Sequence, residues 1–253
     1  MNHPILPGAE PLEHVGDGPN GALVIHGYTG NPSSMRELAE TFVAAGYDVE
    51  MPRLPGHGTH VDDMIPTRWD DYVAEVEGAY RRLAARSDKV VVAGLSMGGA
   101  LTLRMGADHP EIAGLICINA ATAPIGLEDM VPVMQQMLDA GEEVAPGIGS
   151  DIADPGATES AYEGAPIRAM LSLIEGLQEL APKYPEMHMP LLILESPQDH
   201  VVPPGHQDYL AANYGGPVER IVLERSYHVA TLDYDKQLIF DAAVAFAEKV
   251  TGA

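Results

Sequence analysis

The serine at position 96 stands in a sequence pattern that is typical of a nucleophile. Residues 94–98 read Gly-Leu-Ser-Met-Gly, directly after the apolar run of residues 89–93 and before a helical run that begins at Gly99. A Gly-x-Ser-x-Gly pattern between a strand and a helix predicts a sharp turn that lifts the serine hydroxyl above a sheet. Glycine suits both flanking positions, because strand and helix leave no room there for a Cβ atom. We therefore predict that Ser96 attacks a carbonyl carbon.

A serine nucleophile needs a base, which is usually a histidine held by a carboxylate. With this type of turn the chain order is serine, then acid, then histidine. Of ten histidines, those that follow the region expected to hold the acid are His200, His206 and His228. His228 comes just after the strand-like run of residues 218–223, so its loop returns to the carboxyl edge of the sheet. His200 adjoins the acid candidate, and His206 begins a helix and is expected to face solvent, so we predict His228 as the base.

The acid is predicted to be Asp199, in a turn that follows the strand-like run of residues 191–195. That position lies at the same carboxyl edge of the sheet as the base. Glu195 would lie within the strand and point into the packing of the sheet. Asp233 and Asp235 come after the base in the chain, and we expect them to cap the final helix.

Residues 26–30, His-Gly-Tyr-Thr-Gly, follow the first clear strand-like run. A flexible backbone at this place can aim an N–H group at the oxygen of a substrate, together with the N–H of the residue after the nucleophile. This assigns the backbone N–H groups of Tyr28 and Met97 to an oxyanion hole. His26 precedes the serine in the chain, and we expect it to support the loop rather than to react.

A mostly parallel sheet with crossover helices would bring the predicted serine, acid and base to one edge, and the sequence predicts such a sheet. Short apolar runs rich in β-branched residues alternate with helical patterns, and near-continuous apolar runs are typical of strands covered on both faces. The predicted strands are residues 22–26, 89–93, 114–120, 191–195 and 218–223, with 48–51 as a weaker candidate.

Helical spacing is clearest in residues 69–83, where apolar side chains recur on one face. Ser34 and Glu37 have the spacing of a capping box for a helix that reaches about residue 45. A buried helical face near the C-terminus is predicted from Leu238, Ala242, Phe246 and Val250.

Residues 122–187 interrupt the alternation of strands and helices. This stretch contains helical pieces at about 127–140 and 167–180, separated by Gly- and Pro-rich segments, and no convincing strand. We predict a small helical cap inserted above the carboxyl edge of the sheet, where open α/β sheets bind ligands. The whole chain, residues 1–253, is then one domain. Four methionines either belong to the core or form a soft wall for an acyl chain: Met130, Met134, Met137 and Met170.

Composition narrows the possible partners and locations. A net charge of −23, from 37 acidic and 14 basic residues, disfavours nucleic acid and anionic lipid as ligands. The single cysteine, Cys117, excludes an internal disulfide or a cysteine-based zinc site, and its apolar neighbours predict a buried strand position. The first residues lack the features of a signal peptide, and no run approaches the ~20 apolar residues needed for a membrane span. We therefore expect a cytoplasmic protein with no stable membrane insertion.

Taken together, these motifs resemble the bacterial monoacylglycerol lipase and carboxylesterase branch of the α/β-hydrolases. The segments that carry the resemblance are residues 26–30, 53–58, 94–99, 199–204 and 226–235. The resemblance implies the α/β-hydrolase fold, an acyl-enzyme on Ser96, and no cofactor or metal. It also implies that the cap residues Ile148 and Glu159 contact the glycerol part of the substrate. Residues 53–58 either shape a loop or bring His57 or His60 to the substrate.

The expected reaction is hydrolysis of a monoacylglycerol to a fatty acid and glycerol. A broad carboxylesterase would share every motif and differ in the selectivity of the cap. A thioesterase or acyltransferase would use the same acyl-enzyme with another acceptor, and a non-catalytic ligand-binding protein of this fold is a fourth alternative. The expected partner is a small lipid ester. The oligomeric state is left open.

Overall fold

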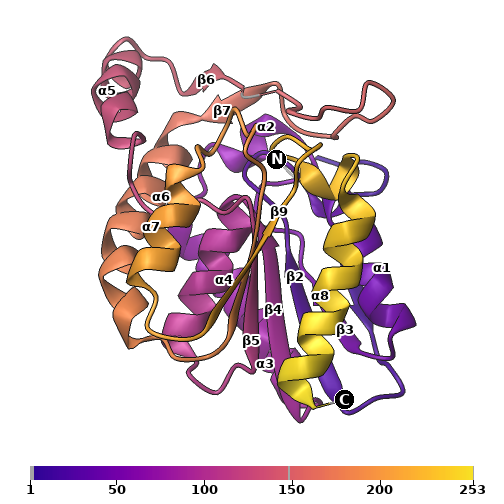
Figure 1. Cartoon of the computed structure of the whole chain (residues 1–253). Coiled ribbons are helices and arrows are strands. Elements are labelled where there is room, and N and C mark those ends of the chain that lie inside the picture. The colour runs from indigo at the N-terminus through magenta and orange to yellow at the C-terminus, as the bar shows by residue number, and fades with distance from the viewer. Residues whose placement is uncertain (1–2, 148, 253) are drawn as a thin grey trace.

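The computed structural model describes residues 3–147 and 149–252, and its centre is a seven-stranded sheet. The strand order is β1-β3-β2-β4-β5-β8-β9 (Figure 1); β1 pairs antiparallel with β3, and all other pairs are parallel. The strands are β1 (Leu12–His14), β2 (Asn20–Ile25), β3 (Asp48–Met51), β4 (Lys89–Leu95), β5 (Gly114–Ile118), β8 (Leu191–Glu195) and β9 (Val218–Val222). This confirms the predicted mostly parallel sheet, including the weaker candidate β3.

Helices cover both faces of the sheet, as predicted. They are α1 (Arg36–Ala44), α2 (Val61–Met64), α3 (Trp69–Ala84), α4 (Met97–Asp108), α5 (Val131–Asp139), α6 (Ile167–Leu180), α7 (Gly205–Asn213) and α8 (Lys236–Thr251). Short 3₁₀ turns are η1 (Pro32–Ser34), η2 (Glu128–Met130), η3 (Ala181–Glu186) and η4 (Ala230–Leu232). α3, α4, α6 and α7 pack on one face, and α1 and α8 pack on the other.

Alternation along each strand divides the core into these two layers. In β2, Leu23 and Ile25 point into the layer under α3 and α4, whereas Ala22 and Val24 point toward α1 and α8. Successive side chains of a strand face opposite sides, so a parallel strand covered twice must be apolar at every position. β9 lies at an edge of the sheet and is partly exposed, which explains its charged residues.

The predicted cap of α1 was wrong, and the predicted buried face of α8 was wrong at one position. Ser34 does not cap α1; it ends η1, and its hydroxyl donates to the Asn31 carbonyl, while the Asn31 side chain accepts the N–H of Ser33. A 3₁₀ turn that begins with Pro32 therefore precedes α1. In α8, Phe246 is buried and Ala242 and Val250 pack against the core, as predicted, but Leu238 is 43% exposed.

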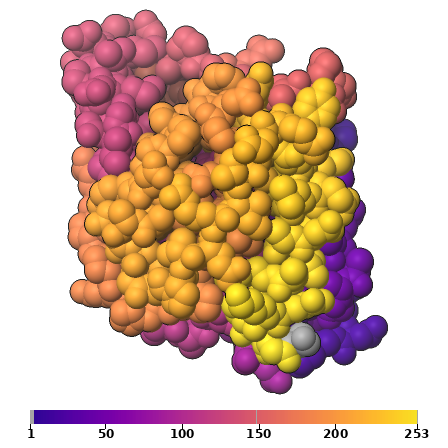
Figure 2. All heavy atoms as spheres, in the orientation of Figure 1, coloured from indigo at the N-terminus to yellow at the C-terminus, as the bar shows by residue number. Residues whose placement is uncertain are grey.

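The chain between β5 and β8 forms α5, α6 and a small antiparallel pair of strands, β6 (Val144–Pro146) and β7 (Gly164–Pro166). The expectation of no strand here was wrong, whereas both predicted helical pieces are present. Figure 1 places α5, β6 and β7 above the upper end of the sheet, and Figure 2 shows the α5 region projecting from the body at the upper left. α6 has a largely buried face and packs against α3 and α4. The single domain and the limits of the cap remain predictions.

Within residues 3–147 and 149–252, no helix has both the length and the apolar character needed to cross a membrane. Cys117 is fully buried in β5, as predicted, and burial raises the pKa of its thiol.

Gly94 offers a test of the turn between β4 and α4. A Cβ at this position would collide with the backbone carbonyl of Gly98, whereas a Cβ at Gly205 meets nothing within 4 Å. We expect Gly94→Ala to lower the free energy of unfolding by more than about 3 kcal/mol, beyond ordinary overpacking, and Gly205→Ala to leave it nearly unchanged. Thermal and urea unfolding followed by circular dichroism measure both variants. Equal stabilities of the two variants would contradict the predicted clash between a Cβ at position 94 and the Gly98 carbonyl.

Candidate active site

Ser96 sits at the turn between β4 and α4 in a strained backbone conformation, with φ 56° and ψ −119°. A positive φ is unusual for a residue with a Cβ atom and must be held by its surroundings. The Ser96 N–H donates to the Ile118 carbonyl of the next strand at 3.0 Å, and the Ser96 carbonyl accepts the N–H of Ala121 at 3.1 Å. Bonds to both sides therefore fix the serine at the carboxyl edge of the sheet, as predicted for a nucleophile elbow.

The loop of residues 26–30 lies directly beside this serine. A Cβ built on Gly27 would come 3.3 Å from the Ser96 Cβ, so the glycine permits the close approach. Thr29 in this loop has a φ of 60°, so it is strained like Ser96. Met97 is the first residue of α4, so its N–H belongs to the helix end that has no intrahelical acceptors.

His228 and Asp199 form a buried hydrogen-bonded pair. The His228 Nδ1 lies 2.8 Å from the Asp199 Oδ2, and both residues are at most 9% exposed. The other carboxylate oxygen of Asp199 accepts the N–H groups of Val201 and Val202, each at 2.8 Å. These bonds orient the carboxylate toward Nδ1 of the imidazole and leave Nε2 for a proton from another group.

Ser96 and His228 line the same cavity, together with Tyr28, Val201 and Glu159. The cavity has a volume of about 30 Å³, enough for water but not for a lipid. A strained serine and a histidine that line one cavity, with a buried carboxylate bonded to the histidine, are the parts needed for acyl transfer through a covalent intermediate.

Glu159 brings a carboxyl group from the segment above the sheet into this cavity. The residue is half-buried, but its carboxyl is enclosed by protein atoms, and one oxygen lies close to Gly30. Burial raises the pKa of Glu159 from its ordinary 4.5 to about 7, and the positive charge of a protonated His228 opposes the rise. The predicted Ile148 lies outside the described residues.

The chain matches known proteins over almost its full length. Residues 19–235 match the family model described as serine aminopeptidase, S33. The chain is 43% identical to the thermostable monoacylglycerol lipase of Bacillus sp. (strain H-257), over 99% of this chain and 98% of that protein. The chain is 22% identical to a carboxylesterase of Bacillus subtilis (strain 168), over 92% and 94%.

A solved structure of the metagenome-derived lipolytic enzymes LipS and LipT superposes with a TM-score of 0.92 at 43% identity, covering 97% of this chain and 100% of that one. The chain belongs to the serine aminopeptidase S33 family. Within that family it is a serine hydrolase of the esterase and lipase branch of the α/β-hydrolases, which confirms the predicted fold and resemblance.

The other carboxylates considered for the acid have different partners in this α/β-hydrolase. Glu195 forms a two-point ion pair with Arg220, with both distances 2.8 Å. Asp235 occupies the N-cap position of α8, as expected, but its carboxylate makes no capping hydrogen bond, and Asp233 lies before the cap. Asp235 accepts from the N–H and the guanidinium of Arg225. Asp233 joins the backbone of the base loop to that of residues 153–154.

The other histidines of the serine hydrolase have structural contacts. His26 is fully buried; its Nδ1 contacts the Gly27 carbonyl and its Nε2 accepts the Leu54 N–H, so it supports the loop as predicted. Burial lowers its pKa, as it does that of His206. The expectation that His206 faces solvent was wrong. It lies in the first turn of α7 with its side chain buried, and its Nδ1 accepts the N–H of Thr122.

Residues 53–58 shape a loop. His57 is buried, and burial lowers its pKa to about 4. Neither His57 nor His60 is among the described residues that line the cavity with Ser96.

Of the four cap methionines, Met130 is 46% exposed, Met134 is buried, and none of them is among the lining residues either. The one group of His, Asp and Glu side chains found close enough to hold a metal ion, in the described part of the chain, is His3, His60 and Asp62 on the surface.

Asn119 links the loops of the acid and the base, and the sequence analysis missed it. It directly follows β5 and has a φ of 42°. Its side-chain nitrogen donates to the carbonyl of His228 at 2.9 Å, and its side-chain oxygen accepts the Ser196 N–H at 2.8 Å. A polar residue after a central strand was the available signal, but its two partners are far apart in the sequence.

Asp151 is a second residue that the sequence analysis missed. One carboxylate oxygen accepts the N–H groups of His200 and His228, each at 3.1 Å, and the other lies 2.8 Å from the His200 Nδ1. The Asp151 carbonyl accepts the N–H of Val229 at 3.0 Å. Asp151 therefore holds the backbone of the base and of the residue after Asp199, although it comes from the segment above the sheet.

Removal of the Asp151 carboxylate tests this support. We expect Asp151→Ala to lower kcat about 10- to 100-fold, because a small displacement of the base weakens proton transfer, while KM changes little. Asp154→Ala is the matched control, because its carboxylate accepts only from Gly156 in the same segment. Steady-state ester hydrolysis measures both. A wild-type kcat in Asp151→Ala would show that the loop of His228 keeps its position without the Asp151 carboxylate.

Glu159 predicts a pH-dependent stability. The folded protein keeps this proton up to about pH 7, whereas the unfolded chain releases it near pH 4.5. The contribution of Glu159 to stability therefore falls as pH rises from about 4.5 to about 7 and is constant above that. The melting temperature of Glu159→Gln minus that of the wild type should increase over this range. The exposed Glu142→Gln should show no such trend.

Proposed function

We propose that this chain hydrolyses monoacylglycerols, with Ser96 as nucleophile, His228 as base and Asp199 as the acid that orients the base. The observation that carries the proposal is the 2.8 Å contact between His228 Nδ1 and Asp199 Oδ2, beside a cavity shared by His228 and Ser96. The near-full-length similarity to a thermostable monoacylglycerol lipase supports the choice of substrate.

The reaction has two halves. His228 Nε2 takes the proton as Ser96 Oγ attacks the ester carbonyl, and the backbone N–H groups of Tyr28 and Met97 stabilise the oxyanion. The protonated His228 then gives its proton to the departing glycerol oxygen, which leaves an acyl group on Ser96. Water activated by His228 attacks this acyl-enzyme, and the fatty acid is released. Asp199 keeps the imidazole in the tautomer that carries a proton on Nδ1.

Glu159 and Ile148 are proposed to contact the glycerol part of the substrate. Glu159 lines the cavity opposite the base, and at a pKa of about 7 its carboxyl both donates to and accepts from hydroxyl groups near neutral pH. A small polar pocket for the alcohol favours monoacylglycerols over diacylglycerols and triacylglycerols. The family resemblance, rather than a described position, supports the role of Ile148.

A peptidase reaction is the alternative that the family description raises. An aminopeptidase must bind the positively charged amino terminus of its substrate. Of the described residues that line the cavity, Glu159 alone carries a carboxylate, and burial raises its pKa and so favours its neutral form. This favours a hydroxyl-bearing alcohol over an ammonium group. A broad carboxylesterase differs from our proposal only in selectivity.

Other predictions about partners and location stay predictions. The relatives are lipases and esterases by name, which supports a small lipid ester as the substrate. The net charge of −23 disfavours nucleic acid as a ligand and the phosphates of a coenzyme A thioester. Cytoplasmic location rests on the sequence alone.

Hydrolysis of a substrate panel by wild type and Ser96→Ala tests the proposal. The panel contains 1-monolauroylglycerol, dilauroylglycerol, p-nitrophenyl butyrate and an amino-acid p-nitroanilide. We expect a clear preference for the monoacylglycerol, and a loss of roughly four to six orders of magnitude in kcat in Ser96→Ala. Preference for the aryl ester would indicate a general carboxylesterase, and preference for the anilide a peptidase. Substantial activity in Ser96→Ala would remove this serine from the mechanism.

A further inference from the structure

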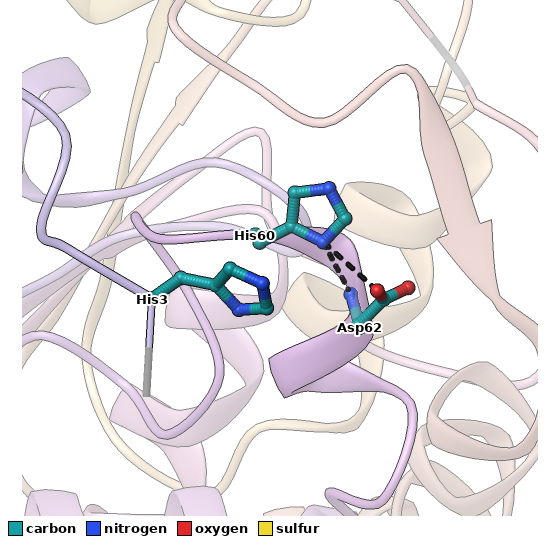
Figure 3. Close-up of side chains that lie close together, drawn as sticks. All are labelled: His3, His60 and Asp62. Carbon is teal, nitrogen blue, oxygen red and sulfur yellow. Dashed lines mark hydrogen bonds and ion pairs between the residues drawn. The ribbon is translucent and has the colours of Figure 1, made fainter. Parts of the chain in front are cut away.

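Two histidines and an aspartate from separate parts of the chain meet on the surface next to α2 (Figure 3). His3 belongs to the N-terminal segment, His60 is the N-cap of α2, and Asp62 lies in its first turn. One ligand atom of each lies within 4.8 Å of the other two. We propose that His3, His60 and Asp62 form a binding site for a zinc ion.

The spacing of the donor atoms of His60 and Asp62 suits a tetrahedral ion. His60 Nδ1 lies 3.3 Å from the Asp62 Oδ2. Two ligands at about 2.0–2.1 Å from a tetrahedral zinc are about 3.4 Å apart, so these atoms need little movement. His60 Nδ1 also lies 3.3 Å from the Asp62 nitrogen, and zinc at the lone pair of Nδ1 would replace this long hydrogen bond.

A further carboxylate orients the second histidine. His3 Nδ1 lies 3.0 Å from the Asp63 Oδ1, and the His3 N–H donates to the other oxygen of Asp63 at 3.3 Å. Metal-bound histidines commonly present one ring nitrogen to a carboxylate and the other to the metal. Asp63 therefore leaves His3 Nε2 as the ligand atom, on a ring whose centroid is 4.5 Å from that of His60.

The donor set selects the class of metal. Two imidazole nitrogens with one carboxylate oxygen suit zinc and its neighbours in the first transition series, whereas calcium and magnesium prefer oxygen donors. Water completes the coordination of the ion, because His60 and Asp62 are exposed. The ester hydrolysis proposed above needs no metal, and none of these three residues is among those that line the cavity with Ser96.

The place of the site indicates a structural role. The N-terminal segment already bonds to the loop before α2 through the Leu6 N–H and the Gly58 carbonyl. The same loop holds Tyr162 of the segment above the sheet, whose hydroxyl donates to the Gly56 carbonyl and accepts the Thr59 N–H, each at 2.8 Å. A zinc ion at His3 and His60 therefore fastens the N-terminal segment to a loop that supports the cap.

Zinc titration of the untagged, EDTA-treated full chain tests the proposal. A histidine tag would compete for the metal and must be absent. We expect one zinc per chain by isothermal titration calorimetry, and a melting temperature that rises with zinc concentration. His3→Ala and His60→Ala should each weaken zinc binding at least about tenfold, whereas the exposed His188→Ala should leave it unchanged.

Magnesium distinguishes a built site from general attraction to the acidic surface. We expect magnesium neither to raise the melting temperature as zinc does nor to displace zinc. Asp62→Asn, which keeps the size of the side chain, replaces either histidine variant if that variant fails to fold. Zinc binding that survives the His60 and Asp62 substitutions, binding of magnesium with equal affinity, or no zinc bound would each overturn the proposal.

Discussion

The strained backbone of Ser96 is the feature on which the rest of this α/β-hydrolase depends. A residue with a φ of 56° holds that conformation only if its neighbours impose it. Here the Ile118 carbonyl accepts the Ser96 N–H, and the Ala121 N–H donates to the Ser96 carbonyl. The glycines around Ser96 let β2, β4 and α4 approach closely. The central position of β4 in the sheet follows from the same requirement, since both neighbouring strands must contribute to the turn.

The sequence predicted the fold well because its strongest signals are local. A strand buried on both faces must be apolar throughout, so the central strands could be predicted from their apolar runs. The glycine pattern around Ser96 predicts a turn between a strand and a helix. The order of serine, acid and base along the chain then selected Asp199 and His228. The structure brings these two into contact at 2.8 Å, although their roles in catalysis remain proposals.

The sequence was less informative where polar residues bind backbone groups far away in the chain. Asn119, Asp151 and Asp233 each join loops separated by tens of residues, and no periodicity marks such contacts. The burial of His206 was not predicted for the same reason, because its partner Thr122 follows β5 and lies far from α7 in the sequence. The strands β6 and β7 are three residues long, too short to produce a pattern of alternation.

The hydrogen bonds of Asp151 and Asp233 attach residues 151–154 of the segment above the sheet to the catalytic loops. Residues 151–154 are bonded to the loops of the acid and the base, so they form one body with the reacting groups. A cavity of about 30 Å³ must enlarge before an acyl chain occupies it. If residues 151–154 moved away, the base would lose its support at the moment of reaction. Residues 151–154 therefore belong to the support of the reacting groups, and room for an acyl chain that keeps His228 in place has to come from another part of the segment.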